Sequence, residues 1–322
     1  MLKQRAKNIL RAIGKPAFKN ELLALQTTSL AYQGMIEQYE KDLVLKNPSC
    51  EGIVFSKDRA MQLHALLLSY FAYVKNPAKL QILFTTSNKH HSRAYDDLKK
   101  IFADKPVTFI REQSFKKDFE KLLQAITTTT VFFMTDDGLF IDSFDMQEVI
   151  TFNPVHVLPS LIKGKDLTYC YIRNQKQALP EFINPKDITL PPFMICWKWA
   201  NAQSGSDWAY PMSVDLTFYQ KKEVETLVKN ISYKAPNSLE TALHNNYAAI
   251  FVKRTGLCYE KAKYVNVVAN VVNTEHKNRH SGLHSAESLL EKWQAGYRIQ
   301  YELFYGKNCG EVEASPFSFV LR

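Results

Sequence analysis

The 322-residue sequence lacks the glycine-rich loops that open the common nucleotide-binding folds. No GxGxxG follows its first predicted strand, and no GxxxxGK[ST] occurs anywhere. In those motifs the glycines let backbone N–H groups approach phosphate closely. Their absence argues against a dinucleotide oxidoreductase and against a P-loop NTPase.

Paired cysteines and long apolar segments are also missing. The five cysteines are scattered without a CxxC pair, which argues against a zinc site or a disulfide framework and favours a reducing, cytoplasmic compartment. No apolar run approaches the length of a membrane span. Residues 2–14 contain no long apolar core, so no secretory signal peptide is expected. The cysteines are Cys50, Cys170, Cys196, Cys258 and Cys309.

Positive charge is in excess, with 41 basic and 32 acidic residues and a net charge of +9. In residues 1–15 five basic side chains share one helical face and apolar side chains the other. A basic amphipathic helix is typical of contact with an anionic membrane surface, so residues 1–48 are predicted to form a helical segment that binds the membrane peripherally. Docking on the rest of the chain is the alternative. No helix-turn-helix, RNP-like or zinc-finger motif is present, so nucleic acid is not an expected partner.

Strand and helix patterns alternate between residues 53 and 134. Strands are predicted at 53–56, 80–86, 107–111 and 131–134, and helices at 61–74, 92–102 and 115–126. Strands that alternate with helices of this length form βαβ units with right-handed crossovers. The fold class is therefore α/β, with a mostly parallel central sheet flanked by helices and an α+β region after it.

Two carboxylates follow the last of these strands. Residues 131–140 read VFFMTDDGLF, so Asp136 and Asp137 come directly after a buried strand. Ligands bind at the carboxyl edge of open α/β sheets. Two carboxylates there suit Mg²⁺ or Mn²⁺ with a phosphate-bearing substrate. The alternative is a turn that only ends the strand.

The loop after the first strand carries Ser56, Asp58 and Arg59. Such side chains at a sheet edge can hydrogen-bond a base and a ribose or face phosphate. Thr86, at the end of the second strand, belongs to the same predicted edge. The alternative is that Asp58 caps the following helix while Arg59 lies in solvent.

Together, the Ser-x-x-Arg-like loop, the three βα units and the acidic pair resemble glycosyltransferases of the GT-A fold, of the family-2-like, bacterial polysaccharide or glycolipid type. Residues 53–140 carry the resemblance, with Thr135-Asp136-Asp137 in place of the DxD motif and Thr135 replacing its leading acid. The resemblance implies a nucleotide-sugar site formed by Ser56, Asp58, Arg59, Thr86, Thr135 and Asp136, and a Mn²⁺ or Mg²⁺ site formed by Asp136 and Asp137.

The resemblance also implies transfer from a nucleotide-diphosphate sugar to a glycan or lipid-linked acceptor in cell-surface polysaccharide synthesis. Residues 49–150 would form the nucleotide-sugar-binding half and residues 151–322 the acceptor-binding, catalytic half of one domain. Two alternatives stay open. The first is a nucleotidyltransferase, although such an enzyme normally has a glycine-rich, basic phosphate loop and residues 56–60 contain no glycine. A catalytically degenerate, glycan-binding homologue is the other, because Thr135 departs from the motif.

In the second half, aromatic residues suit an acceptor cleft, because sugar CH faces stack on aromatic rings. Trp199, Trp208 and Tyr210 are the candidates. Of Trp197 and Trp199, one is expected to pack in the core and the other to lie toward the cleft. Core packing of these rings is the alternative.

Two acidic residues are candidates for the catalytic base. Asp215 lies alone among apolar residues of a predicted strand at 212–218, where a charge costs free energy unless it is paired or bound. Glu240 lies near a predicted helix start, capped by Asn237 or Ser238. In order and context it matches the acidic helix start of the resembling inverting enzymes, although Thr241 replaces the aspartate that commonly follows. The alternative is a favourable interaction of Glu240 with the helix dipole.

A late histidine is a further candidate to complete the metal site. Three histidines recur every four residues late in the sequence, and Gly282 argues against one continuous helix through all three. A loop over the active site is therefore predicted. The candidates are His276, His280 and His284.

Overall fold

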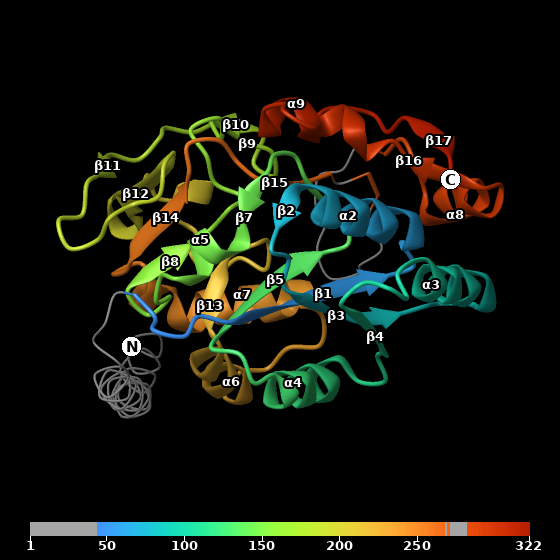
Figure 1. The fold of residues 1–322 in the computed structure, drawn as a ribbon, viewed down its shortest axis with the longest axis horizontal. Helices are drawn as coiled ribbons and strands as arrows, with labels where there is room; N and C mark the ends of the chain where they lie inside the picture. Colours follow the sequence, from blue (N-terminus) through green and yellow to red (C-terminus); the bar gives the residue numbers. More distant parts are fainter. Residues whose placement is uncertain (1–43, 268, 271–281) are drawn as a thin grey trace, which may run out of the picture. The chain divides into compact units, whose positions relative to one another are not determined.

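The computed structural model describes residues 44–267, 269–270 and 282–322. Its centre is a five-stranded sheet in the order β13-β5-β1-β3-β4 (Figure 1). β1, β3, β4 and β5 are parallel to their neighbours, and β13 pairs antiparallel with β5 at the edge. The prediction of a mostly parallel central sheet is confirmed. Because β13 comes from the second half of the sequence, both halves contribute to one sheet.

The first half of the sheet follows the sequence pattern closely. Buried β-branched and aromatic residues form the strands, and amphipathic segments form the helices between them. Each of the seven predicted elements is present, with boundaries within a few residues of those expected. The elements are β1 (Cys50–Lys57), α2 (Ala60–Tyr73), β3 (Lys79–Thr85), α3 (Lys89–Ile101), β4 (Val107–Arg111), α4 (Phe115–Ala125) and β5 (Thr130–Thr135).

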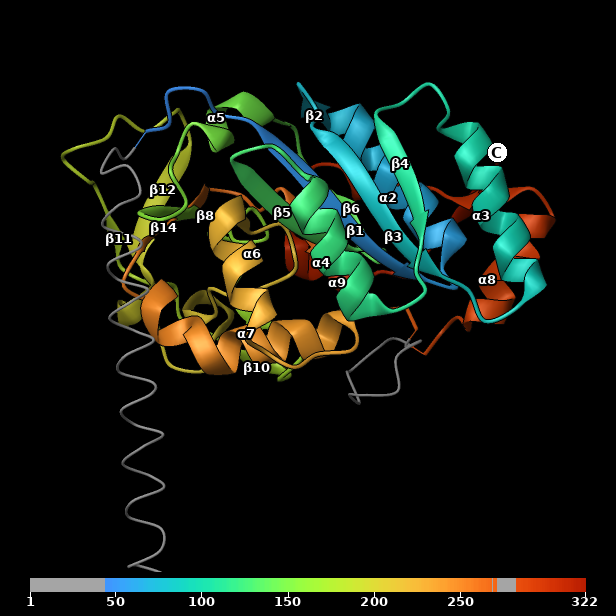
Figure 2. The same ribbon diagram turned by 90° about the horizontal axis from the view of Figure 1, so that it is seen from below.

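Helices cover both faces of this sheet. In Figure 1, α2 lies above the sheet, whereas α4 and α6 (Lys221–Lys229) lie below it. Figure 2 shows the lower face, with α4, α6 and α7 (Pro236–Phe251) in front of the strands. This change of face follows from the strand order, because the chain moves outward from β1 to β4 and then returns to β5 on the other side of β1. The carboxyl ends of β1 and β5 therefore lie side by side.

Smaller sheets and short helices surround the central sheet. A second sheet has the order β11-β12-β14-β8, and the pairs β2-β7, β6-β15, β9-β10 and β16-β17 complete the strands of the described residues. The remaining elements are β2 (Val74–Lys75), β6 (Gly138–Phe140), β7 (Phe144–Asp145), α5 (Met146–Ile150), β8 (Val157–Pro159), β9 (Tyr169–Cys170), β10 (Gln175–Lys176), β11 (Phe182–Ile183), β12 (Met194–Lys198), η1 (Trp199–Asn201), η2 (Asp207–Ala209), β13 (Phe218–Gln220), β14 (Thr255–Tyr259), β15 (Tyr264–Asn266), α8 (Ala286–Gln294), β16 (Tyr297–Ile299), η3 (Tyr301–Phe304), α9 (Cys309–Glu313) and β17 (Phe319–Leu321).

Aromatic side chains fill the layer between the sheet and α4. Phe55 of β1 packs against Phe119 of α4 and Phe133 of β5, with ring centroids 5.6 and 6.0 Å apart. On the strand itself, Gly52 lies against the ring of Phe132, and a Cβ at this position would come within 2.4 Å of that ring. The glycine thus allows β1 and β5 to pair where the large ring crosses the strand.

Two strand predictions in the second half are wrong. The strand expected at 167–172 is reduced to β9, and the segment expected as a strand at 212–218 is irregular until β13 begins at Phe218. The physical reason for the second difference is Leu216, whose φ of 47° is left-handed and interrupts an extended chain. This turn lies directly after Asp215.

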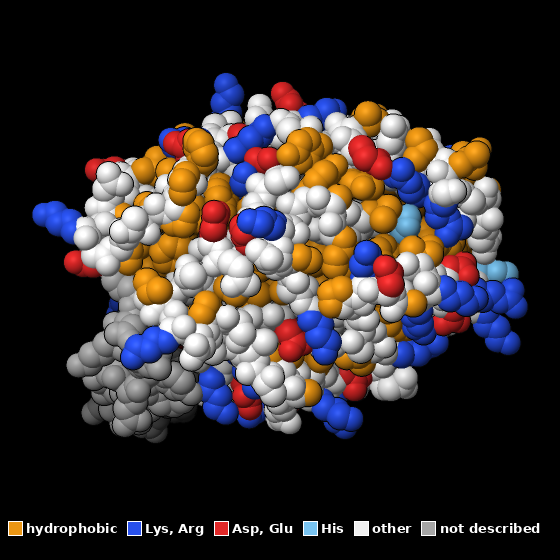
Figure 3. All heavy atoms as spheres, in the orientation of Figure 1, with side chains coloured by type: hydrophobic (Ala, Val, Ile, Leu, Met, Phe, Trp, Pro, Cys, Tyr) orange, Lys and Arg blue, Asp and Glu red, His pale blue; other side chains and the backbone are white. Residues whose placement is uncertain are grey.

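The surface bears on two sequence expectations. Figure 3 shows one face, on which basic and acidic side chains are interspersed and basic ones are most frequent toward the edge where α3 lies. No described helix is long and apolar enough to cross a membrane. The basic segment at residues 1–15 lies outside the described residues, so its predicted contact with a membrane stays a prediction.

Candidate active site

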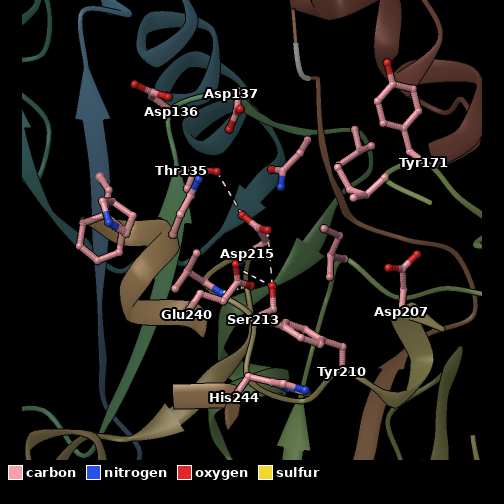
Figure 4. A pocket seen from close by; sticks show the side chains of 18 of the residues that line it. Thr135, Asp136, Asp137, Tyr171, Asp207, Tyr210, Ser213, Asp215, Glu240 and His244 are labelled. Atoms are coloured by element: carbon pink, nitrogen blue, oxygen red, sulfur yellow. Dashed lines mark hydrogen bonds between the residues drawn. The ribbon is translucent and has the colours of Figure 1, made fainter. Parts of the chain in front are cut away.

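A cleft with a volume of about 940 Å³ lies at the carboxyl edge of the central sheet. Residues after β1 and β5 form one wall, and the segment around η2 forms another (Figure 4). Both predicted acidic pairs line this cleft. They are Asp136 with Asp137, and Asp215 with Glu240.

Arg59 holds the first acidic pair. Its Nη1 lies 3.0 Å from Asp136 Oδ1 and 3.0 Å from Asp137 Oδ2, and its Nε donates to Asn270 Oδ1 at 2.8 Å. The Arg59 side chain is buried, so the alternative that it lies in solvent is wrong. Burial lowers the pKa of Arg59, but the two carboxylates more than offset this and raise it above its usual value. A permanently charged group therefore compensates the two acids.

Asp136 is fully engaged by the protein. Its Oδ2 accepts from Ser56 Oγ at 2.8 Å and from the backbone N–H of Lys57 at 3.0 Å, while Oδ1 accepts from Arg59. Burial raises the pKa of Asp136 to about 6, against the lowering effect of Arg59. Asp136 therefore joins the end of β5 to the loop after β1 and is a positioning residue in this structure.

The two carboxylates differ in their fit to a divalent cation. Asp137 has one oxygen, Oδ1, without a hydrogen-bond partner among the described residues, which suits a metal ligand. Both oxygens of Asp136 accept hydrogen bonds and Arg59 contacts both acids, so the part of Asp136 in a metal site stays a prediction. No group of three or more His, Cys, Asp or Glu side chains that could hold a metal occurs within residues 44–267, 269–270 and 282–322. One carboxylate combined with substrate phosphates is a common arrangement for Mg²⁺.

Two candidates for nucleotide-sugar binding lie outside the cleft lining. Asp58 is buried with a φ of 55°, and it accepts from the backbone N–H of Ser87 at 2.8 Å. It thus joins the loops after β1 and β3 and does not cap α2. Thr86 is half-buried, and its Oγ1 accepts from Arg111 Nη2 at 3.1 Å. The structure therefore brings together Ser56, Arg59, Thr135 and Asp136, but neither Asp58 nor Thr86 faces the cavity with them.

Asp215 lies between the two walls of the cleft, next to the end of β5. Its Oδ1 accepts from Thr135 Oγ1 at 3.1 Å, and its backbone N–H donates to Ser213 Oγ at 3.1 Å (Figure 4). Burial raises the pKa of Asp215, hydrogen bonds from Asn266 and Thr135 lower it, and the negative charge of Asp137 raises it further. The contact explains Thr135, because a carboxylate at this position would repel Asp215, whereas a hydroxyl can donate to it.

Glu240 lies on the first part of α7 and faces the same space. The helix begins at Pro236, earlier than predicted, with Ala235 as its N-cap residue. Ser238 therefore lies inside the first turn, where its Oγ accepts a hydrogen bond from the backbone N–H of Ala235 at 3.0 Å. Glu240 Oε1 accepts from the backbone N–H of Val214 at 3.3 Å, so residues 213–215 connect the two acids. Burial and the nearby Asp215 raise the pKa of Glu240 to about 8. Near pH 7 this group can hold a proton or release one.

The predicted acceptor-binding tryptophans belong to the core. Trp199 is 1% exposed and Trp208 0% exposed, and both pack against Trp197 with ring centroids 4.6 and 5.0 Å apart. The expected division of Trp197 and Trp199 between core and cleft is wrong, because residues two positions apart share one face of a strand, and because η1 begins at Trp199 after the strand ends at Lys198. Of the three aromatic candidates, Tyr210 lines the cleft.

Several cleft residues were not predicted. Lys163 is buried at the cleft, Arg173 lies close to Gly205, and His244 stacks on Tyr210 with ring centroids 4.2 Å apart. His244 follows Glu240 by four residues, so helical periodicity could have indicated it. The other cleft residues come from loops, whose meeting no local pattern signals.

Of the three late histidines, His284 lies among the described residues and does not line the cleft. It packs against Phe319, with ring centroids 5.3 Å apart. His276 and His280 lie outside the described residues, so their predicted role at the metal stays a prediction.

Comparison with known proteins supports the resemblance read from the sequence. No protein-family model matches the chain. Over 192 residues the chain is 28% identical to the bifunctional glycosyltransferase pgtA of Dictyostelium discoideum. The match covers 56% of this chain and 25% of that protein, so the chain spans about a quarter of the relative's length.

Solved structures show weaker similarity. S. aureus TarS superimposes with a TM-score of 0.43 and 12% identity over 69% of this chain and 37% of its own. GalNAc-T7, solved with UDP, GalNAc and Mn²⁺, gives a TM-score of 0.38 and 9% identity over 69% of this chain and 45% of its own. A nucleotidyl transferase from Methanothermobacter gives a TM-score of 0.37 and 8% identity, over 67% of this chain and 89% of its own. All three TM-scores are below 0.5, so sequence similarity is the stronger finding. It confirms the resemblance to glycosyltransferases: this chain is a relative of a glycosyltransferase, built on an α/β fold with a mostly parallel central sheet.

Proposed function

We propose that the chain transfers a sugar from a nucleotide-diphosphate donor to a hydroxyl of a glycan or lipid-linked acceptor. The observation that carries the proposal is the meeting of two acidic pairs in one cleft at the carboxyl edge of the sheet. Arg59 bridges one pair, whereas the described residues form no ion pair with Asp215 or Glu240, and the nearby buried Lys163 only partly offsets the rise that burial causes in their pKa values. Binding a phosphate-bearing donor and removing a proton from an acceptor require these two different environments.

The donor belongs at the wall formed by the ends of β1 and β5. Ser56, Lys57 and Arg59 line this wall together with Thr135 and the first acidic pair. Hydroxyl and cationic side chains suit ribose and diphosphate. When bound, Mn²⁺ or Mg²⁺ would neutralise the charge that develops on the departing nucleotide diphosphate, with Asp137 as its ligand from the protein.

The acceptor hydroxyl belongs between Glu240 and Asp215. In an inverting transfer a carboxylate takes the proton of this hydroxyl as its oxygen attacks the anomeric carbon in line with the leaving group. Glu240 is our first choice for this base, because its pKa of about 8 suits proton transfer near neutral pH. Asp215, held by Thr135, is the second choice and could instead orient a sugar hydroxyl.

Finer aspects of the function are part of the proposal. Dependence on Mn²⁺ or Mg²⁺, a role in cell-surface polysaccharide synthesis and a cytoplasmic location at the membrane surface were expected from the sequence. The first is supported by the unpartnered Asp137 Oδ1. The membrane contact would rest on residues 1–15.

The decisive experiment measures release of free nucleotide from UDP-, GDP-, CMP- and dTDP-linked sugars, with and without Mn²⁺ and with simple glycosides as acceptors. Thermal shift with the free nucleotides would first identify the base. Release that depends on an acceptor supports the transferase. Nucleotide binding with no release from any donor would support the degenerate homologue. Pyrophosphate production from a nucleoside triphosphate and a sugar phosphate would support a nucleotidyltransferase instead.

A further inference from the structure

Two stacked rings lie next to the proposed base. Tyr210 follows η2, and His244 lies on α7 one helical turn after Glu240. The rings are 4.2 Å apart between centroids with an interplanar angle of 19°, and both line the cleft. Figure 4 shows this ring pair below Ser213 and Glu240, with Asp207 to the right of Tyr210. The pair therefore lines the cleft on the side away from the wall formed by the ends of β1 and β5.

The imidazole of His244 has unused hydrogen-bonding capacity. Its Nδ1 is buried and has no hydrogen-bond partner in the part of the chain that the structure describes. Burial lowers the pKa of His244, so the ring is neutral and offers one donor and one acceptor nitrogen. A buried polar atom without a partner costs free energy. A ligand in the cleft could remove that cost.

The spacing on the helix limits what such a ligand can be. Side chains four residues apart on a helix are neighbours, with Cβ atoms about 5–6 Å apart. A single sugar ring in contact with Glu240 can therefore also reach His244. Tyr210 lines the same cleft, and a phenol ring with a hydroxyl suits the mixed apolar and polar surface of a sugar.

We propose that Tyr210 and His244 form the acceptor subsite, and that the His244 imidazole hydrogen-bonds a second hydroxyl beside the one that Glu240 deprotonates. The acceptor is then a sugar with neighbouring hydroxyls. This inference rests on the proposed function and adds the acceptor class to it. His244 is a positioning residue, because it orients the acceptor without taking its proton.

The test compares His244→Phe, which keeps a ring against Tyr210, with His244→Gln, which keeps hydrogen-bonding groups. Methyl hexosides are the acceptors, each with its singly deoxygenated analogues. We expect His244→Phe to raise the acceptor KM about tenfold or more, the factor that corresponds to one lost hydrogen bond. His244→Gln should recover part of this loss, and affinity for the free nucleotide should stay unchanged in both. His90→Phe, on the exposed start of α3, is the matched control.

A double-mutant cycle identifies the hydroxyl. Removing the second hydroxyl should weaken the wild-type acceptor about tenfold and should have little further effect in His244→Phe. Equal losses in both proteins, or an unchanged KM in His244→Phe, would overturn the inference. Donor hydrolysis that no methyl hexoside stimulates would also overturn it while leaving donor chemistry intact. Absence of nucleotide release from every donor would instead refute the proposed function.

Discussion

The pair Asp136–Asp137 and the pair Asp215–Glu240 line the same cleft, but their neighbours are opposite in kind. A buried guanidinium lies 3.0 Å from both members of the first pair. The two acids of the second pair accept hydrogen bonds from a hydroxyl and from a backbone N–H group, and the nearby cation is the buried Lys163, which forms no ion pair with them among the described residues. The pKa of Asp136 is raised to about 6, and that of Glu240 to about 8. Near neutral pH Asp136 is therefore mostly charged beside Arg59, whereas Glu240 can hold a proton or release one.

The difference shows that carboxylates take their roles from what surrounds them. An acidic pair bridged by Arg59 suits the wall at which we propose that the donor binds, and a carboxyl group with a raised pKa is suited to exchange a proton with an acceptor. Thr135 connects the pairs, because it precedes Asp136 in the chain and hydrogen-bonds Asp215.

The largest expected effect is on turnover. Glu240→Gln keeps the shape of the side chain and removes the proton acceptor, so kcat should fall by about 10²–10⁴-fold while nucleotide affinity is retained. Steady-state kinetics and nucleotide titration measure the two quantities, with the exposed Glu287→Gln as control. Near-normal turnover would move the role to Asp215 or indicate a retaining mechanism.

The same variant should change how stability depends on pH. The pKa of Glu240 is raised from 4.5 to about 8 on folding, so the folded state binds this proton more tightly than the unfolded state. The tighter binding of this proton raises the free energy of unfolding fully below pH 4.5, and the gain is lost as the pH rises through about 8. Denaturant unfolding at a series of pH values should show this decline in the wild type and a weaker decline in Glu240→Gln. Parallel curves would contradict the assignment.

The next effect is on folding stability at the other pair. Arg59→Met should lower the free energy of unfolding by about 3–5 kcal/mol, because two buried carboxylates lose their cation. Urea denaturation measures this, and Arg93→Met on the exposed face of α3 should cost less than about 0.5 kcal/mol. Adding Asp136→Asn to Arg59→Met should restore part of the loss. Equal stability of Arg59→Met and wild type would mean that the pair does not depend on the guanidinium.

Metal dependence separates the two members of the first pair. Asp137→Ala should weaken nucleotide binding in Mn²⁺ about tenfold or more and leave metal-free binding nearly unchanged, because it removes the unpartnered Oδ1. Calorimetric titration with and without Mn²⁺ is the measurement, and Asp96→Ala on α3 is the control. An Asp137→Ala protein that keeps the full Mn²⁺ effect would rule out this ligand.

The smallest effect concerns the residue that joins the pairs. Thr135→Val removes the hydrogen bond to Asp215 and should reduce kcat/KM about tenfold or less, whereas Thr135→Ser should stay near wild type. The pH profile should also shift to higher pH in Thr135→Val, since the lost hydrogen bond favours the charged form of Asp215. Identical behaviour of the valine and serine variants would assign the residue a packing role only.

The sequence by itself determined the βα half of this protein. Its strands and helices are marked by local periodicity, and the place of Asp136 and Asp137 follows from the strand that precedes them. The strands of a parallel sheet are buried on both faces, so each appears in the sequence as a short run of apolar residues. Such runs can be recognised without knowledge of distant contacts.

Only the tertiary structure decided what these residues meet. Arg59 reaches both acids across 77 and 78 positions of sequence, and Asp215 meets Thr135 across 80. Trp199 and Trp208 are core because three tryptophans pack on one another, which their own neighbours in sequence do not reveal. Local pattern reflects the period of backbone structure, whereas burial, charge compensation and pKa depend on groups that folding brings together from distant parts of the chain.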